Sequence, residues 1–209
     1  MIAIVDYGAG NLRSVVRAVQ SQGANPSVTS SGADVDRADA LILPGVGAAA
    51  DTMAHLRQYD LVEPLCAYIA SGRPFLGVCM GLQALLTGSE EGGWHACLDI
   101  VDGRVKRFSN DLIVPHMGWN QVDVRRDHPV FRDIPDHSFF YFVHSYYCAP
   151  ASEDTIVATT AYGGDFPSVL GGGNWIATQF HPEKSGAAGL RVYKNFLTWA
   201  GVMLEPATR

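Results

Sequence analysis

The chain has 209 residues, of which 47% are hydrophobic and 17% charged, and its formal net charge is −6. This length fits one domain with a sizeable core, so we expect residues 1–209 to form a single domain. A net negative charge without any basic run argues against a nucleic-acid surface or an anionic-membrane surface.

Several features of the sequence exclude other classes. The first residues have no charged segment before an apolar run, as a signal peptide would have, and no apolar stretch approaches a membrane span. Cys66, Cys79, Cys97 and Cys148 show neither CxxC pairing nor the spacing of zinc ligands. We therefore expect a cytoplasmic protein with reduced thiols, no metal and no cofactor.

The first half of the chain alternates predicted strands and helices. Apolar runs predict buried strands over residues 2–5, 38–43 and 75–78. Leu12, Val15, Val16 and Val19 follow the first strand at helical spacing, and Gly23 is a plausible stop. Residues up to about 71 read as helical with an interruption near Pro64, and another helix is predicted to start over Met80 to Leu86. The order β-α-β-α-β-α implies a mostly parallel sheet with helices on both faces.

The turn after the first strand carries two glycines, at positions 8 and 10. This is a weak dinucleotide-binding signal, because the third glycine of that fingerprint is missing. We therefore discount a nucleotide cofactor at this turn.

The second half of the chain consists of short predicted strands. They cover residues 103–108, 121–124, 139–143, 155–160 and 175–179, and some of them are expected to form a small antiparallel extension. Gly163-Gly164 and the glycines at 171–173 predict tight turns. A last helix is predicted from about residue 189 to 200, with Leu190, Tyr193, Phe196 and Leu197 on one face. The fold class is therefore α/β, with a mostly parallel central sheet.

Cys79 lies at the sharpest predicted turn of the chain. The strand over 75–78 ends directly before it, a helix starts directly after it, and Gly77 and Gly81 flank it at two residues. A nucleophile on such a turn is held in a strained conformation, and its neighbours crowd unless they lack side chains. A helix start also favours the reactive thiolate. The alternative is a buried cysteine between two packing glycines.

His181 and Glu183 form a second candidate group. Residues two apart in extended backbone point to the same face, and Pro182 keeps His181 extended. A carboxylate placed in this way orients the imidazole and leaves its other nitrogen free to take a proton from a thiol. Cys79, His181 and Glu183 together make a nucleophilic triad, whereas His181 alone would be an ordinary loop histidine.

A thiol that attacks acyl carbon needs hydrogen-bond donors for the developing oxyanion. The N–H of Met80 is one candidate. The loop over residues 44–47 is the other, because it leaves a neighbouring strand end and its glycines let backbone approach a substrate. An ordinary strand–helix turn explains this loop equally well.

Longer stretches carry a specific resemblance. Gly77-Val-Cys-Met-Gly-Leu-Gln83 together with His181-Pro-Glu183 resembles the class I, or triad-type, glutamine amidotransferases. Five further stretches resemble the family of glutaminase subunits of imidazole glycerol phosphate synthases. They are Asp6-Tyr-Gly-Ala-Gly-Asn-Leu12, Pro44-Gly-Val-Gly47, Pro115-His-Met-Gly-Trp-Asn120, Tyr141-Phe-Val-His-Ser-Tyr146 and His181-Pro-Glu-Lys-Ser185. The resemblance covers residues 2 to about 199.

This resemblance implies a three-layer α/β fold and a glutaminase. Cys79 would attack the glutamine amide, His181 would shuttle the proton and Glu183 would orient His181, through a γ-glutamyl thioester. The family pattern places Val46, Gly47 and Met80 at the oxyanion hole, and Gly45, Gln83, Ser145 and Tyr146 at the substrate.

The resemblance also implies a partner. Ammonia would pass to a separate cyclase subunit, a TIM barrel, which makes imidazole glycerol phosphate and aminoimidazole carboxamide ribotide in histidine biosynthesis. Asn11, Trp119, Tyr141 and Lys184 match positions that face this partner. The alternative for Trp119 and Tyr141 is core packing, and the alternative for Lys184 is a solvated charge. The chain has no room for an acceptor domain, which agrees with a separate partner. Two alternatives stay open: the glutaminase subunit of another class I amidotransferase, and a non-catalytic binding subunit.

Overall fold

The computed structural model describes residues 1–8 and 11–203, so Ala9 and Gly10 of the first glycine turn lie outside the described residues. An eight-stranded sheet runs through the molecule in the order β2-β1-β3-β4-β14-β13-β12-β9. In that order, its strands are β2 (Ser27–Thr29), β1 (Ile2–Val5), β3 (Ala40–Leu43), β4 (Phe75–Val78), β14 (Trp175–Thr178), β13 (Asp165–Gly171), β12 (Ile156–Ala161) and β9 (Asp123–Val124). The strands from β2 to β14 are parallel, and β13, β12 and β9 continue the sheet antiparallel. The predicted mostly parallel sheet is confirmed.

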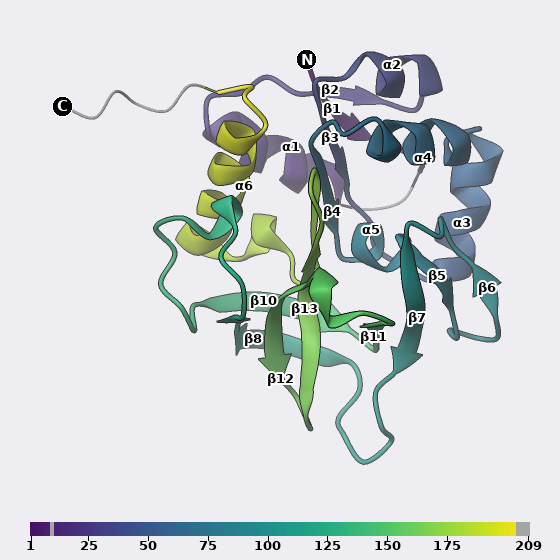
Figure 1. Ribbon diagram of the computed structural model, residues 1–209, viewed down its shortest axis with the longest axis vertical. Coiled ribbons are helices and arrows are strands. Elements are labelled where there is room, and N and C mark those ends of the chain that lie inside the picture. The colour runs from purple at the N-terminus through teal and green to yellow at the C-terminus, as the bar shows by residue number, and fades with distance from the viewer. Residues whose placement is uncertain (9–10, 204–209) are drawn as a thin grey trace.

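Helices cover both faces of this sheet (Figure 1). On one face lie α1 (Leu12–Ser21) and α6 (Gly186–Trp199), and on the other lie α2 (Gly32–Arg37), α3 (Ala49–Gln58) and α4 (Val62–Ala70). In β1, Ile2 and Ile4 pack in the first core, while Ala3 and Val5 pack in the second. Successive strand residues point to opposite faces, so a strand covered on both sides must be apolar throughout.

Two smaller sheets extend the fold around the carboxyl ends of the parallel strands. One has the order β11-β7-β5-β6 and the other pairs β10 with β8. Their strands are β5 (Leu86–Ser89), β6 (His95–Ala96), β7 (Val101–Arg107), β8 (His116–Gln121), β10 (Phe139–His144) and β11 (Tyr146–Pro150). Short 3₁₀ turns complete the chain as η1 (Pro129–Phe131), η2 (Glu153–Thr155) and η3 (Pro182–Lys184). Apart from the parallel β5–β7 pair, the strands of these two sheets pair antiparallel, so the antiparallel part is larger than the small extension that the sequence indicates.

Some predicted boundaries were wrong. The long helical region breaks at residues 59–61, between α3 and α4, and Pro64 lies inside the first turn of α4. A proline is tolerated there, because the first N–H groups of a helix have no intrahelical acceptor. The helix after Cys79, α5 (Met80–Gln83), is a single turn, and Leu86 already belongs to β5. The short elements β2 and α2 were not predicted.

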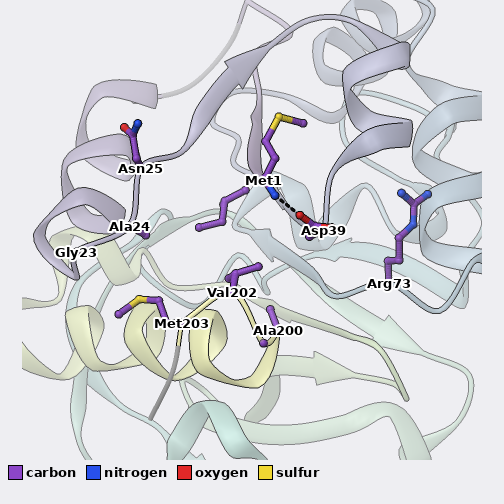
Figure 2. A pocket seen from close by; sticks show the side chains of 11 residues that line it. Met1, Gly23, Ala24, Asn25, Asp39, Arg73, Ala200, Val202 and Met203 are labelled. Atoms are coloured by element: carbon purple, nitrogen blue, oxygen red, sulfur yellow. Dashed lines mark hydrogen bonds and ion pairs between the residues drawn. The ribbon is translucent and has the colours of Figure 1, made fainter. Parts of the chain in front are cut away.

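The two ends of the parallel strands differ in what gathers there. A cavity of about 710 Å³ lies at the amino ends, where Met1, Asp39 and Arg73 precede their strands. Figure 2 shows it next to Ala200 and Val202, with the Met1 amino group paired to Asp39. Sites in sheets of this kind form at the carboxyl ends instead, and Cys79 lies at that end, after β4. Among the described residues, no helix is both long and apolar enough to cross a membrane.

Candidate active site

Cys79 occupies a strained turn between β4 and α5. Its φ of 55° and ψ of −102° lie where residues with a side chain are rarely found. A Cβ on Gly77 would lie 2.7 Å from the Gly81 carbonyl oxygen, and one on Gly81 would lie 2.0 Å from the Leu43 carbonyl oxygen. The two glycines are therefore required for α5 to pack against β3 and β4 while Cys79 stays at the apex.

His181 and Glu183 are held together directly after β14. His181 is extended, with φ −100° and ψ 98°, and Pro182 begins the 3₁₀ turn η3 that carries Glu183. The His181 Nδ1 atom lies 2.8 Å from Glu183 Oε1, and both side chains are only 2% exposed. A carboxylate oxygen accepts, so Nδ1 carries the proton and Nε2 is left for chemistry. Nε2 is buried and makes no hydrogen bond of ordinary geometry among the described residues.

The environment of His181 favours its charged form. Burial lowers the pKa of His181, but Cys79 and Glu183 outweigh burial and raise it to about 10. An imidazolium next to a thiolate is the arrangement that activates a cysteine nucleophile. Tyr193 Oη donates to Glu183 Oε2 at 3.4 Å and holds the far side of the carboxylate.

A cavity of about 260 Å³ opens above Cys79. It brings together most of the candidate site residues from distant parts of the chain. Its lining consists of Val46, Gly47, Cys79, Met80, Gln83, Glu91, Pro115, Val143, His144, Ser145, Tyr146 and His181. Gly45 and Glu183 do not line this cavity. Glu183 lies behind His181, and Gly45 is buried beside Tyr7 and Met80.

The loop over residues 44–47 points a carbonyl at the expected oxyanion site. The Met80 N–H donates to the Gly45 carbonyl oxygen at 3.4 Å. The next glycine, Gly47, has φ +100°, a conformation that favours glycine. In this state the Met80 donor is already occupied by the loop.

Three of the four expected partner-facing residues lie side by side. Trp119 and Tyr141 are opposite each other in the β8–β10 pair, and their rings meet edge to face at 6.3 Å. The Lys184 ammonium lies 5.7 Å from the centre of the Tyr141 ring. Trp119 is 56% exposed, so it is not a core residue. Asn11 is exposed at the start of α1, which packs beside η3.

The sequence did not identify three polar residues near the site, Gln179, His144 and His116. Gln179 Nε2 lies 3.6 Å from the Cys79 sulfur, and His144 lines the cavity with His116 behind it. Their only signal is a polar residue inside or directly after an apolar strand. Met117 and Phe139 are exposed on the same surface of the β8–β10 pair as Trp119, and they too were not predicted.

One surface group has the donor set of a metal site. Asp123, Asp136 and His137 place one ligand atom each within 4.8 Å of one another. Arg125 already pairs with Asp123 at 2.8 Å, and the N–H groups of Val124 and His137 donate to Asp136. The group lies outside the cavity above Cys79.

Comparison with known proteins identifies the family of the chain. The sequence model of the family described as "Glutamine amidotransferase class-I" matches residues 3–199. A curated protein of Chloroflexus aurantiacus, "Imidazole glycerol phosphate synthase subunit HisH", is 52% identical over 96% of this chain and 96% of its own length. A protein of the same name from Dehalococcoides mccartyi is 50% identical over 96% of this chain and 98% of its own length.

Solved structures agree on the fold. A crystal structure described as a glutamine amidotransferase superposes with a TM-score of 0.76 at 20% identity, over 96% of this chain and 100% of that chain. A structure of PurLQS from Thermotoga maritima has a TM-score of 0.76 at 17% identity, over 95% of this chain and 97% of that one. At these identities the structures support the three-layer fold alone.

Proposed function

The chain belongs to the class-I glutamine amidotransferase family, and we propose that Cys79, His181 and Glu183 are its catalytic triad. Its curated relatives named as subunits of imidazole glycerol phosphate synthase are about half identical to it over almost their whole length. The chain is therefore a glutaminase subunit of imidazole glycerol phosphate synthase, an enzyme of histidine biosynthesis. The observation that carries the triad is the hydrogen bond from His181 to Glu183, made by a ring that shares its cavity with Cys79.

The chemistry follows from the three side chains. The Cys79 thiolate attacks the side-chain carbonyl carbon of glutamine, and the electron pair of the carbonyl moves onto oxygen. His181 donates its proton to the amide nitrogen, the C–N bond breaks, and ammonia leaves a γ-glutamyl thioester. His181 then takes a proton from water, whose oxygen displaces the sulfur and releases glutamate. Glu183 keeps the ring in one tautomer throughout.

Backbone and substrate contacts complete the proposed site. The Met80 N–H and the N–H groups of Val46 and Gly47 serve as oxyanion donors once the loop over 44–47 has turned its Gly45 carbonyl away. The glutamine itself is bound by Gln83, Ser145 and Tyr146, which line the cavity, and by the backbone at Gly45.

The partner is a cyclase subunit, which we propose to be a TIM barrel. The partner face consists of the exposed or half-buried side chains on the β8–β10 pair and η3: Met117, Trp119, Phe139, Tyr141 and Lys184. Asn11 borders this partner face at the start of α1. Exposed aromatic and methionine side chains are typical of interface cores. We place the complex in the cytoplasm, where the four free cysteines would stay reduced.

Thiol alkylation tests the proposed triad. In the native protein, iodoacetamide should label Cys79 faster than Cys66, Cys97 and Cys148, because burial raises the pKa of each of the other three thiols. Labelling of Cys79 should slow in Glu183→Ala and stay unchanged in Glu153→Ala, which removes an exposed carboxylate on η2. Equal labelling of all four thiols would count heavily against an activated Cys79.

Co-purification tests the partner. The chain and the cyclase should form a complex that makes product from glutamine. A chain that hydrolyses glutamine but does not bind the cyclase would instead be the glutaminase of another class I amidotransferase.

A further inference from the structure

A buried amide that the triad does not use touches the reacting atom. Gln179 follows β14 directly and its side chain is fully buried. Its Nε2 lies 3.6 Å from the Cys79 sulfur, and its Oε1 lies 3.0 Å from Gln83 Nε2. Its backbone N–H donates to the Ser168 carbonyl oxygen at 2.8 Å, which fixes where the side chain starts.

The Tyr146 carbonyl decides which end of this amide faces the sulfur. A carbonyl oxygen only accepts, and Gln83 lies 3.1 Å from it, so Gln83 must present its nitrogen there. The same Gln83 nitrogen faces Gln179, which must therefore present its oxygen to Gln83. The nitrogen of Gln179 is then directed at Cys79. The direction of each amide follows from one acceptor that cannot donate.

The Tyr146 carbonyl also determines which ring nitrogens of two histidines, His144 and His116, carry a proton. His144 Nδ1 lies 2.8 Å from the Tyr146 oxygen and must carry the proton. In the neutral ring Nε2 is then an acceptor, and it receives the Nδ1 proton of His116 at 2.9 Å. His116 Nε2 in turn accepts from the Asn120 side chain at 3.1 Å.

This direction requires both rings to be neutral, and burial enforces that state. His116 is 4% exposed and His144 6% exposed. Burial lowers the pKa of His116 to about 4. It also lowers the pKa of His144 to about 3, against the raising effect of the Tyr146 hydrogen bond.

We propose that Gln179 is a further catalytic residue, which donates an N–H to the Cys79 thiolate, and that His116 and His144 are positioning residues that keep it so directed. The inference rests on the proposed function, since it assigns a role at the same sulfur. A donor to an anionic sulfur stabilises the thiolate more than the neutral thiol, because hydrogen bonds to charged acceptors are the stronger ones. The helix α5 is a single turn, so its dipole stabilises the thiolate little, and a side-chain donor supplies the stabilisation instead.

The chain of bonds also connects the partner face to the nucleophile. His116 and Asn120 lie on β8, the strand whose other face presents Met117 and Trp119.

The pH profile of Cys79 alkylation by iodoacetamide tests this inference without glutamine or cyclase. Gln179→Met keeps the approximate shape and removes the donor. We expect alkylation of Cys79 at neutral pH to fall about tenfold, and the midpoint of the profile to rise by about one pH unit. Labelling of Cys66 in the same molecule is the internal reference. Asn195→Met is the matched control, because it removes an amide that donates to the Val130 and Arg132 carbonyls on another part of the fold. Its profile should equal that of the unmodified chain.

A second pair of variants tests the positioning residues. His144→Leu removes the N–H that holds the Tyr146 carbonyl and should raise the midpoint, whereas His144→Asn keeps a donor near the Nδ1 position and should restore most of the original profile. If Gln179→Met does not fold, Gln179→Glu has nearly the same volume and, once ionised, removes the donor and repels the thiolate.

The outcomes separate the two proposals. A folded Gln179 variant with the original rate and midpoint overturns the role of Gln179. A shifted Gln179 variant next to an unshifted His144→Leu overturns the positioning role alone. If Cys79 of the unmodified chain reacts no faster than Cys66, the proposed triad fails as well.

Discussion

The two sides of Cys79 are prepared to different degrees. On the base side, His181 is fixed by Glu183 at 2.8 Å, and both side chains are almost completely buried. On the oxyanion side, the Met80 N–H is taken by the Gly45 carbonyl, and Val46 is 37% exposed on a loop with a left-handed glycine. The proposed nucleophile and base are already in place, whereas the charge proposed to develop on the substrate oxygen has no free donor at Met80.

This difference indicates which part of the site a partner could regulate. A packed triad in a buried site has one low-energy arrangement, because moving it would expose or leave unpaired a buried charge. A loop with two glycines can rotate a peptide at a cost of only a few kcal/mol. A partner that binds one loop state better can therefore switch turnover on without touching the triad.

The largest expected effect removes Cys79, the proposed nucleophile that lies between the two sides. Cys79→Ala should abolish glutamate release, because no other described thiol lines the cavity. The assembled complex should still make product from ammonium salt, since the proposed cyclisation uses no group of this chain. Both reactions are measured on the same preparation. Loss of the ammonium-dependent reaction in a folded, assembled complex would show that Cys79 does more than release ammonia.

The second prediction concerns the oxyanion side. Loss of one oxyanion donor typically costs about 10²–10³ in rate. We therefore expect glutamate release to be slow for the free chain, little changed by the empty cyclase, and raised by about 10²–10³ when the cyclase binds its nucleotide substrate. Steady-state glutamate release in the three states measures this. A free chain that already works at the full rate would mean that the loop over 44–47 is only a turn.

A substitution in the loop sharpens this prediction. Proline fixes φ near −65°, so Gly47→Pro cannot keep the observed +100° and should remove the stimulation while Cys79 alkylation stays intact. Gly45→Pro should also remove the stimulation, but a Cβ there would lie 2.3 Å from Tyr7 Oη and 2.6 Å from Met80 Cβ, next to Cys79, so Gly47→Pro is the variant in which Cys79 alkylation is compared. Gly72→Pro is the matched control for Gly47→Pro, since Gly72 also has a positive φ, +81°, in open space at a surface turn.

The same contrast describes how much of the structure could be predicted from the sequence. The parallel strands β1, β3 and β4 are continuous apolar runs followed by helices, so their order along the chain and their type could be predicted. Cys79 and the His181–Glu183 pair are likewise local in sequence, next to glycines and a proline that constrain the backbone. Local patterns were sufficient because both faces of the sheet are buried.

The parts that could not be predicted depend on long-range pairing. β11 and β13 contain proline and alternate little, and they form only because β7, β12 and β14 provide partners. β2 is three residues long, too short for any period to show. The Gly45 carbonyl, Gln179 and the His116–His144 pair meet Cys79 or its neighbours only through tertiary packing, so no local pattern marks them. The type of a residue does not by itself reveal the direction of the hydrogen bond that its side chain makes.

The third prediction tests whether the partner face is the surface through which the cyclase acts on this chain. If the partner face binds the cyclase, Trp119→Ala should weaken the complex by about 2–4 kcal/mol, as aromatic hot spots do. Trp94→Ala is a close control, because Trp94 is 55% exposed and Trp119 is 56% exposed, yet Trp94 lies beside β6 away from the partner face. Titration calorimetry with the cyclase measures both. Equal affinities for the two variants would remove Trp119 from the interface.

The last prediction concerns how the free energy of unfolding depends on pH, through His181 on one side of the cavity and His116 and His144 on the other. His181 has a raised pKa, so its contribution to stability is complete below pH 6.5 and is lost only as pH rises toward about 10. His116 and His144 have lowered pKa values of about 4 and about 3, so they bind protons in the unfolded chain before they do so in the folded one. Stability should therefore fall as pH drops below 6.5, by about 1.4 kcal/mol per pH unit for each fully titrating histidine.

Urea unfolding between pH 6 and pH 4.5 isolates this term. The double variant His116→Gln with His144→Asn keeps polar groups in the chain but cannot titrate, so its stability should depend less steeply on pH than that of the unmodified protein. His128, whose pKa burial also lowers to about 4, contributes equally to both proteins and cancels in the comparison. The carboxylates with lowered pKa values, Asp34, Asp39 and Asp136, titrate mainly below this range and cancel as well. Parallel curves would mean that the two buried histidines are protonated in the folded protein, and His144 Nε2 could then not accept the Nδ1 proton of His116.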